Sequence, residues 1–248
     1  MSTIVKHNFV ILLTGCVSPN GMIYTKLQDS NIRLNQYIKA IFWYLDNVNI
    51  PVVFVENTNY DLFDDVPDLK ERNNFEYLTF NGNDYDKTKG KGYGEGQILK
   101  HALSNSKLIK EDTIIIKITG RLILSNILDL IYDYNHIVSN QLIIMCDVNR
   151  QLNVAFSRVV FAPKSFMSNF FQLQFEKIND SYSYEFEQAL ADSIYMAIGT
   201  GSYMLSLFKR PYHLIGISGT DGELINNKNW LTIKTKYLLS KLYLWGKR

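Results

Sequence analysis

The sequence predicts an α/β fold in which helices cover a mostly parallel central sheet. Short apolar runs alternate along the chain with longer segments whose apolar residues recur at helical spacing. The apolar runs are continuous rather than alternating, which is typical of strands buried on both faces of a parallel sheet. The 248 residues contain no internal repeat and no low-complexity linker, so we expect one layered domain.

The first half of the chain supplies three strands and two helices of this pattern. Phe9–Leu13 is a continuous apolar run, Pro51–Val55 is rich in β-branched residues, and Glu76–Phe80 is the third expected strand. Ile32–Leu45 carries its apolar residues at helical spacing, and a second helix is expected over Glu95–Ser104.

The second half continues the alternation. Thr113–Ile118 is a run of β-branched residues, Gln141–Cys146 is the fifth expected strand and Phe156–Phe161 the sixth. The expected helices are Asn126–Tyr134, Phe166–Phe175, which follows Pro163, and Tyr184–Ile198. Ligands of such sheets bind beyond the carboxyl ends of the strands, so the polar residues that follow each strand are the first candidates for a site.

Composition excludes several classes of protein. Lys and Arg number 26 and Asp and Glu 24, and a net charge of +2 does not predict a nucleic-acid-binding surface. Cys16 and Cys146 lie in apolar runs and cannot form a disulfide framework or a four-cysteine zinc site, which favours a cytoplasmic protein. No apolar run approaches the ~18 residues of a membrane span, so we expect a soluble or at most peripheral protein.

Thr14 and Gly15 follow the first strand directly, and a glycine there lets the backbone approach a ligand closely. The segment matches neither GxGxxG nor GxxxxGK[ST], which disfavours a dinucleotide site and excludes a P-loop. An ordinary turn is the alternative interpretation.

The strongest local signal is the segment 87–95, where glycines alternate with lysines and a tyrosine just before a helix. Its candidate ligand-binding residues are Lys89, Gly90, Lys91, Gly92, Tyr93, Gly94 and Glu95. Bare peptide N–H groups, lysine charges and a helix N-terminus together predict a cradle for a diphosphate. Tyr93 is expected to stack on a base or a sugar. A solvated, flexible loop is the alternative.

Two cations flank a glycine at the end of the fourth strand. Lys117 lies inside the apolar run and Arg121 follows Gly120. A buried lysine is unfavourable unless an anion pairs with it, so the pair suggests phosphate binding. A structural salt bridge from Lys117 to Glu56 or Glu95 is the equally weighted alternative.

Two further carboxylates are candidates for catalysis or for metal binding. Asp147 and Asn149 follow the fifth strand, and this Asp-x-Asn pair is a weak signal for one Mg²⁺ or Mn²⁺ ion, with a strand-end turn as the alternative. Glu187 opens a helix and is either a general base or a favourable charge at the helix N-terminus. No histidine stands at zinc spacing.

Taken together, the segments resemble a group of bacterial glycosyltransferase-like proteins encoded with capsule and lipopolysaccharide assembly genes. The matching pieces are Leu12–Cys16, Arg33–Tyr37, Val53–Asn57, Gly90–Glu95, Lys117–Arg121, Ser157–Arg158 with Ala162–Pro163, Phe186–Glu187 and Gly216–Gly219. They span about residues 8 to 220, nearly the whole chain.

The resemblance implies a GT-A-like fold within a single domain over residues 1–248. About 1–125 would form the nucleotide-sugar-binding half and about 126–225 the acceptor-binding half. By analogy, Thr14, Gly15, Arg33 and the Glu56-Asn57 pair would contact the donor. Many such enzymes place a metal-binding Asp-x-Asp after the fourth strand, where this chain has Lys117, Thr119 and Arg121. These cations would neutralise the departing phosphate without a metal, and Mg²⁺ or Mn²⁺ at Asp147 is the alternative.

The C-terminal segment, about 226–248, is predicted to be a basic, aromatic-rich helix. From Lys228 to Arg248 there are six basic residues and no acidic ones. Such a helix suits the cytoplasmic face of the inner membrane, where a lipid-linked glycan acceptor would be found. A helix docked on the protein body with solvated lysines is the alternative.

These observations predict a glycosyltransferase that moves a sugar from a nucleotide-sugar donor to a glycan acceptor in capsule or lipopolysaccharide synthesis. Charge on the leaving diphosphate would meet the segment 89–95, Lys117 and Arg121. If the reaction inverts the anomeric centre, Glu187 is the first candidate for the base and Asp147 the second. The alternative function is a non-catalytic nucleotide- or glycan-binding module of a polysaccharide assembly complex.

Overall fold

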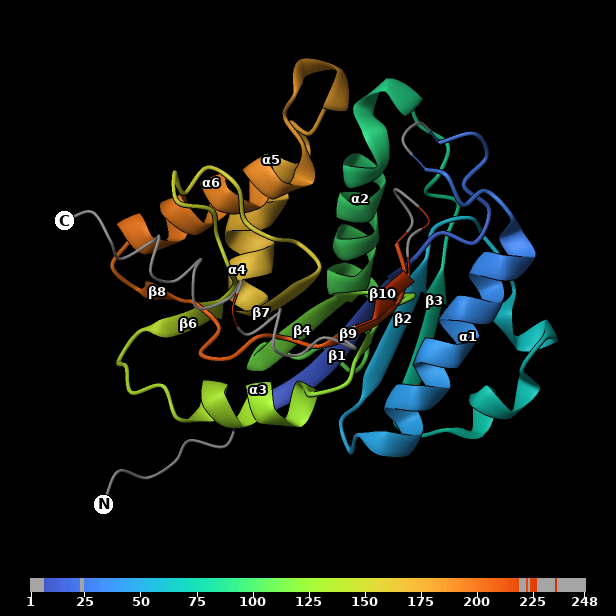
Figure 1. The fold of residues 1–248 in the computed structure, drawn as a ribbon, viewed down its shortest axis with the longest axis horizontal. Helices are drawn as coiled ribbons and strands as arrows, with labels where there is room; N and C mark the ends of the chain where they lie inside the picture. Colours follow the sequence, from blue (N-terminus) through green and yellow to red (C-terminus); the bar gives the residue numbers. More distant parts are fainter. Residues whose placement is uncertain (1–6, 23–24, 219–221, 223, 227–234, 236–248) are drawn as a thin grey trace.

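A mixed, mostly parallel sheet forms the centre of the molecule (Figure 1). The computed structural model describes residues 7–22, 25–218, 222, 224–226 and 235. Within these residues the strand order is β3-β2-β1-β4-β7-β6-β8. The strands are β1 (Asn8–Gly15), β2 (Val52–Glu56), β3 (Phe75–Thr79), β4 (Thr113–Thr119), β6 (Leu142–Met145), β7 (Val159–Pro163) and β8 (Tyr203–Ser206). Only β7 runs antiparallel to its neighbours in this described sheet, so the predicted fold class is confirmed.

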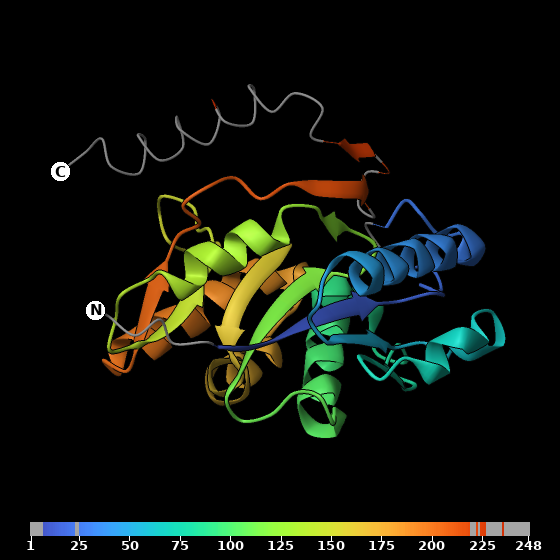
Figure 2. The ribbon, with the colours of Figure 1, turned by 90° about the horizontal axis from the view of Figure 1, so that it is seen from below.

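Helices cover both faces of the sheet, because alternate strand residues point to opposite sides. On one face Ile11 and Leu13 pack with α1 (Ser30–Asn47) and α3 (Ile127–Asn135). On the other face Val10 and Leu12 pack with the remaining helices (Figure 2). These are α2 (Gly90–Asn105), α4 (Lys164–Phe166), α5 (Gln172–Phe175) and α6 (Phe186–Gly199).

A second, small sheet lies beyond α1 and α3 (Figure 2) and was not predicted. It consists of β5 (Ile123–Leu124), β9 (Leu214–Ile217) and β10 (Leu224–Asn226). Arg210 ties the incoming chain to α3 through two hydrogen bonds to Asp133, at 2.7 and 2.8 Å. The carboxamide oxygen of Asn126 then accepts the backbone N–H of His213. These anchors bring Ile217 to the end of β4.

Three predicted elements differ most from the structure. The helix expected from Glu95 begins at Gly90, and the strand expected from Phe156 begins at Val159. The helix expected over Phe166–Phe175 is divided by a π-helical turn, η4 (Met167–Phe171), between α4 and α5. Short 3₁₀ segments complete the described chain: η1 (Leu62–Asp64), η2 (Pro67–Glu71), η3 (Lys87–Lys89) and η5 (Asp180–Tyr182).

Two further predictions concern membrane-spanning segments and the C-terminal helix. Among the described residues, no helix combines the length and the apolar character that crossing a bilayer requires. The basic helix predicted over about 226–248 lies outside the described residues, apart from residues 226 and 235.

Candidate functional site

A pocket of about 340 Å³ opens at the edge of the sheet where β1, β2 and β4 end. From β1 the chain builds outward to β2 and β3 and then returns to β4 on the opposite side of β1. Such a change of direction leaves a crevice beyond the strand ends, which is where open α/β sheets bind ligands. The pocket therefore lies where the topology predicts a site.

A close backbone contact sets the shape of this edge. Thr14 pairs with Thr119 in the sheet, and the N–H of Gly120 donates to the carbonyl oxygen of Thr14 at 3.0 Å. A Cβ atom at position 120 would lie 2.6 Å from that oxygen, so only glycine fits without a shift of the backbone. The contact places Thr14, Thr119 and Arg121 around one pocket.

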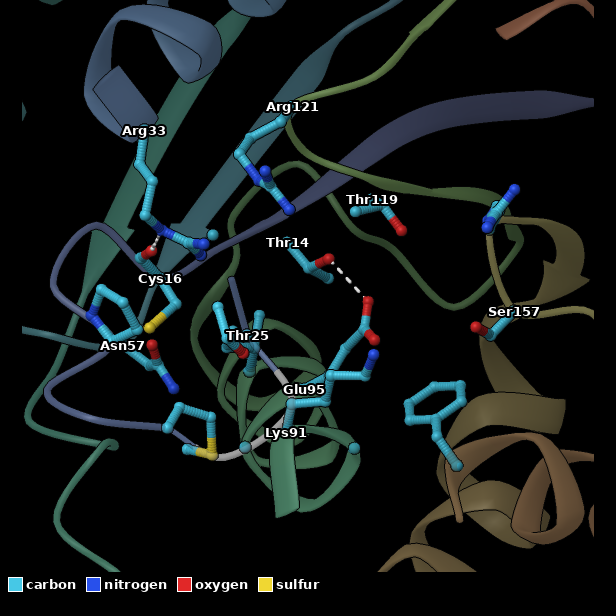
Figure 3. Close-up of a pocket in the computed structure, with 18 of the residues that line it drawn as sticks. Thr14, Cys16, Thr25, Arg33, Asn57, Lys91, Glu95, Thr119, Arg121 and Ser157 are labelled. Carbon is cyan, nitrogen blue, oxygen red and sulfur yellow. Dashed lines mark hydrogen bonds between the residues drawn. The ribbon is translucent and has the colours of Figure 1, made fainter. Parts of the chain in front are cut away.

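Arg121 brings a buried cation into the pocket (Figure 3). Its residue exposure is 8%, and its Nη1 donates to Gln36 Oε1 at 3.2 Å and to the carbonyl of Ile217 at 3.3 Å. Its Nε has no hydrogen-bond partner among the described residues. Burial lowers the pKa of the guanidinium from its usual value. A buried N–H without a partner is costly, and a cation at this place favours the binding of an anion.

Asn57 adds a buried hydrogen-bond acceptor to the same pocket. It follows β2, lines the same pocket and is only 2% exposed. Its Oδ1 has no hydrogen-bond partner among the residues that the structure describes. The residues that line the pocket thus include a buried donor on Arg121 and a buried acceptor on Asn57 that no described residue satisfies.

Lys117 lies behind the pocket rather than in its lining. The side chain is 1% exposed; its ammonium pairs with Glu95 Oε1 at 2.7 Å and donates to the carbonyl of Ser157 at 2.6 Å. The Thr14 hydroxyl donates to the same Glu95 oxygen at 2.8 Å (Figure 3). The expectation of direct phosphate contact is therefore corrected in favour of the salt-bridge alternative.

The ion pair also sets the ionisation of Glu95. Burial opposes the charged carboxylate, but the Lys117 charge and the hydrogen bonds from Lys117 and Thr14 outweigh burial, with help from the charge on Lys91. The pKa of Glu95 is consequently below its usual value. A carboxylate that stays charged presents a fixed negative group to the pocket.

The glycine-rich segment is a helix rather than the expected loop. Because α2 begins at Gly90, Lys91, Glu95 and Ile98 share one helical face and line the pocket. Lys89 and Tyr93 do not line it: the Lys89 ammonium lies 4.2 Å from the centroid of the Tyr93 ring. Tyr93 in turn packs against Tyr85 and Phe175. The prediction that Tyr93 stacks on a base or sugar is not supported by this position.

The glycines of α2 serve close packing. Gly90 has a φ of +80°, and a side chain there would overlap the carboxylate of Asp180. Gly92 lies against Phe186, and side chains at the next two alternate positions, 94 and 96, would overlap Tyr85 and Phe175. The alternating pattern that predicted a phosphate cradle therefore reflects contacts between α2 and its neighbours.

Glu56 and Arg33 hold the chain around the pocket. Glu56 is fully buried and does not line the pocket, because its carboxylate accepts the backbone N–H groups of Val17, Thr58 and Tyr60. Arg33 lines the pocket, but its Nε donates to the carbonyl of Cys16 at 2.7 Å (Figure 3). Both residues therefore order the loops after β1 and β2, and the expected donor contact of Glu56 is corrected.

Asp147 and Asn149 lie away from the pocket and do not form a metal site. Asp147 Oδ1 accepts the backbone N–H of Phe208 at 3.2 Å. Asn149 Oδ1 accepts the N–H groups of Asn153 and Val154. Among the described residues, no group of three His, Cys, Asp or Glu side chains is arranged to hold a metal ion. The donor atoms of the predicted Asp-x-Asn motif are used within the protein, so these residues do not fit Mg²⁺ or Mn²⁺.

Three carboxylates from η5 and the start of α6 form an acidic wall of the pocket. Glu187 accepts the Ser157 hydroxyl at 2.6 Å, and Glu185 and Asp180 lie nearby in the lining. Burial raises the pKa of Asp180 to about 6; Glu185 and Glu187 add to the shift and Lys91 opposes it. Carboxylates with shifted pKa values are enriched in functional clefts, which makes this wall a candidate part of the site.

Sequence reasoning missed Asp180 and quoted Arg158 only as part of a matching piece, without a role in the site; both residues line the pocket. Asp180 follows no strand, and the available signal was the polar turn before the helix. Arg158 precedes β7, whose antiparallel direction places its beginning at the edge where the parallel strands end.

Most of the predicted site residues meet at this pocket. Those in its lining are Thr14, Gly15, Arg33, Asn57, Lys91, Gly92, Gly94, Glu95, Thr119, Arg121 and Glu187. Those outside the lining are Glu56, Lys89, Gly90, Tyr93, Lys117 and Asp147.

Comparison with known proteins shows similarity in fold. No protein-family model matches the sequence, and no curated protein matches it significantly. Apo mouse xyloside xylosyltransferase 1 is 10% identical over 82% of this chain and 85% of its own, with a TM-score of 0.41. A putative nucleotide-diphospho-sugar transferase from Desulfovibrio desulfuricans G20 is 8% identical over 82% and 80%, with a TM-score of 0.43.

The inositol-1-phosphate CTP transferase from T. maritima is 11% identical over 93% of this chain and 96% of its own, with a TM-score of 0.45. Similarities this distant assign no activity to the chain. The structure itself shows a layered α/β protein with a pocket of mixed charge beside β1, where the strand order of the central sheet changes direction.

Proposed function

We propose that the protein is a glycosyltransferase that moves a sugar from a nucleotide-sugar donor to a glycan acceptor in capsule or lipopolysaccharide synthesis. The observation that carries the proposal is the pair of unsatisfied groups on Arg121 and Asn57. Both side chains are more than nine-tenths buried, and both line one pocket beyond the ends of parallel strands. Buried groups without partners in the described chain indicate a ligand that supplies an anion and a hydrogen-bond donor.

The donor diphosphate is assigned to the side of the pocket that holds Arg121 and Lys91. Arg121 is pre-positioned by Gln36 and by the carbonyl of Ile217, and its guanidinium charge lies at the pocket that would hold the diphosphate. Charge develops on the leaving diphosphate as the glycosidic C–O bond breaks, and fixed cations in a partly enclosed site stabilise such charge. Asn57 at the end of β2 is assigned to the nucleoside.

Residues behind the lining keep these groups in place. The Lys117–Glu95 pair links β4 to α2, and Thr14 and Ser157 complete the network from β1 and from the chain before β7. Pre-organisation of this kind lowers the reorganisation that binding and catalysis would otherwise require. We derive no step through a metal, because the Asp147-x-Asn149 donors do not fit one.

Turnover with a panel of nucleotide sugars and glycan acceptors, lipid-linked glycans included, tests the proposal. We expect release of a nucleoside diphosphate together with transfer of the sugar. Release of pyrophosphate with formation of a nucleotide-linked product would instead show nucleotidyl transfer. Saturable binding without any product would support the non-catalytic binding module.

Titration calorimetry with nucleoside diphosphates tests the observation itself. Arg121→Met is expected to weaken binding about 10- to 100-fold, because a hydrogen bond to a charged group contributes ~1.5–3 kcal/mol. Arg72→Met is the matched control, since Arg72 is an exposed arginine paired with Asp46 on the surface. Failure of the wild type to bind any nucleoside diphosphate, or equal losses in the two variants, would contradict the assignment.

A further inference from the structure

Two buried arginines border the pocket, one from the first turn of α1 and one from the turn after β4. We propose that Arg33 and Arg121 together supply the positive charge that binds the donor diphosphate, and that binding and transfer therefore need no divalent metal ion. The inference rests on the proposed glycosyltransferase function, and it names the groups that balance the charge of the diphosphate at that site.

Arg33 is held in place by neutral groups. The residue is 5% exposed. Its Nε donates to the carbonyl of Cys16 at 2.7 Å, its Nη1 to the carbonyl of Leu27 at 3.2 Å and its Nη2 to the hydroxyl of Tyr37 at 3.1 Å. No salt bridge joins Arg33 to a carboxylate of the described residues. The guanidinium is thus fixed beside the pocket without a counter-ion.

Arg121 is in the same state. It is 8% exposed, donates to the Gln36 side chain and to the carbonyl of Ile217, and forms no salt bridge within the part of the chain that the structure describes. Burial lowers the pKa of Arg121; Tyr37 opposes the shift and the like charge of Arg33 adds to it. Figure 3 shows both arginine side chains at the same end of the pocket. Two like charges therefore lie close together at one cavity.

Cations with a structural role in this protein have an acidic partner. Lys117 pairs with Glu95 at 2.7 Å, and Arg210 Nε pairs with Asp133 at 2.7 Å. Burial of a charge is costly unless a counter-charge accompanies it. Two neighbouring buried guanidinium groups without such a partner therefore indicate that an anion binds beside them.

Carboxylates of the chain itself are the alternative counter-ions. Glu56 is fully buried, but it accepts backbone N–H groups of the loops after β1 and β2 and takes part in no salt bridge among the described residues. Asp221 and Glu223 follow β9 in the sequence and lie outside the described residues. Variants at these two positions therefore belong to the test.

The strand end where the resemblance places a metal-binding Asp-x-Asp carries cations in this chain. Lys117 and Arg121 flank Thr119 there. The Lys117 ammonium lies 2.7 Å from Glu95 Oε1 and 2.6 Å from the carbonyl oxygen of Ser157, so the charge of this carboxylate is already balanced. A divalent ion at this edge would be repelled by both cations. The residues here do not fit a divalent ion, and we derive no step through one.

Two guanidinium groups suit a diphosphate. A guanidinium is planar, stays charged at neutral pH and matches phosphate oxygens in pairs. Its charge also acts over several ångströms, because water screens little in a partly enclosed site, so the attraction does not require that a buried nitrogen contacts the ligand. We expect a nucleoside diphosphate to bind more tightly than its monophosphate, which offers fewer negative charges to the two cations.

Titration calorimetry with UDP, GDP, CDP and ADP tests the charge balance independently of activity. We expect binding in EDTA, and Mg²⁺ or Mn²⁺ should strengthen it by less than about 3-fold. Arg33→Met and Arg121→Met should each weaken binding about 10- to 100-fold, to the same extent in EDTA and in Mg²⁺. Arg72→Met is the matched control, because it removes an exposed arginine that pairs with Asp46.

Further variants separate charge from folding. Because Arg33 also holds the chain at Cys16, Arg33→Lys, which keeps the charge, should retain more affinity than Arg33→Met. Inorganic pyrophosphate in EDTA should raise the Tm of the wild type and of Arg72→Met, but not that of Arg121→Met. The double variant Asp221→Asn/Glu223→Gln should bind nucleoside diphosphates as the wild type does.

Three results would overturn the inference and leave the glycosyltransferase proposal intact. They are a requirement for Mg²⁺ or Mn²⁺ in binding or transfer, equal affinities of Arg121→Met and Arg72→Met, and a large gain of affinity in Asp221→Asn/Glu223→Gln. The last result would mean that the chain itself neutralises the arginines. Binding of nucleoside diphosphates in EDTA without transfer of any sugar would overturn the proposed function alone, and absence of all binding and transfer would overturn both proposals.

Discussion

Substituting Lys117 with methionine tests whether Glu95 is held at the pocket by a buried ion pair. The lysine side chain is 1% exposed, and its Nζ lies 2.7 Å from Glu95 Oε1 and 2.6 Å from the carbonyl oxygen of Ser157. Methionine approximates the length and volume of the aliphatic stem but removes the charge and both interactions. The carboxylate of Glu95 and the carbonyl of Ser157 would lose their partner.

The magnitude follows from the geometry. Removal of one partner from a buried pair costs about 3–5 kcal/mol. The Glu95 side chain keeps 23% exposure and the Thr14 hydroxyl as a donor, which places the expected loss near the lower end, about 3 kcal/mol. For a chain of this size that loss lowers Tm by about 6–12 °C.

Urea unfolding followed by circular dichroism measures the change, with Lys100→Met as the control. Lys100 pairs with Glu176 at 3.1 Å, but the two side chains are 49% and 62% exposed, so the control should lose less than about 1 kcal/mol. The double variant Lys117→Met/Glu95→Gln should be more stable than Lys117→Met alone, because it no longer leaves an unpaired carboxylate. Equal losses in Lys117→Met and Lys100→Met would refute the reasoning.

Three further predictions concern the same edge of the sheet. Lys91→Ala should weaken nucleoside diphosphate binding about 5-fold in calorimetry, since an exposed ion pair contributes up to ~1 kcal/mol, whereas Lys89→Ala should not; equal losses would contradict the helical placement of these residues. Gly120→Ala should reduce the free energy of unfolding by about 1–3 kcal/mol, because its Cβ would lie 2.6 Å from the Thr14 carbonyl oxygen. The loss would appear as a lower urea midpoint, and an unchanged midpoint would count against that contact. Because the pKa of Glu95 is lowered in the folded state, its ionised carboxylate contributes stability above pH 4.5 that is lost as the pH falls through the lowered pKa. Between pH 6 and pH 3, the Tm of the wild type should therefore fall more steeply than the Tm of Glu95→Gln.

Much of the fold follows from the sequence because its central strands are continuous apolar runs. The expected strands Phe9–Leu13 and Thr113–Ile118 are the cores of β1 and β4, and Ile32–Leu45 lies within α1. The small sheet was missed because β5, β9 and β10 are short and pair over long sequence separations. The start of α2 was missed because glycine disfavours helix, and tertiary contacts at Gly90 and beyond override that preference.

The site was predictable only where it follows parallel strands. Thr14, Asn57 and Arg121 come together because the carboxyl ends of β1, β2 and β4 share one edge. Sequence alone cannot separate residues that face the pocket from residues that support it. Glu56 was assigned to the ligand, and Lys117 either to a phosphate or to a salt bridge. Their hydrogen-bond partners come from distant segments and keep both residues out of the lining.

The close packing of α2 has a consequence for the order in which the protein folds. Glycine costs about 1 kcal/mol relative to alanine in a helix, so the first two turns of α2 are unstable on their own. They gain stability when later segments of the chain, among them α5, η5 and α6, pack against them. We expect the amides of these turns to be protected from hydrogen exchange only after η5 and α6 have packed against α2. A chain that ends before η5 would lack the acidic residues of the pocket, and its Lys91 would not be held in a stable helix.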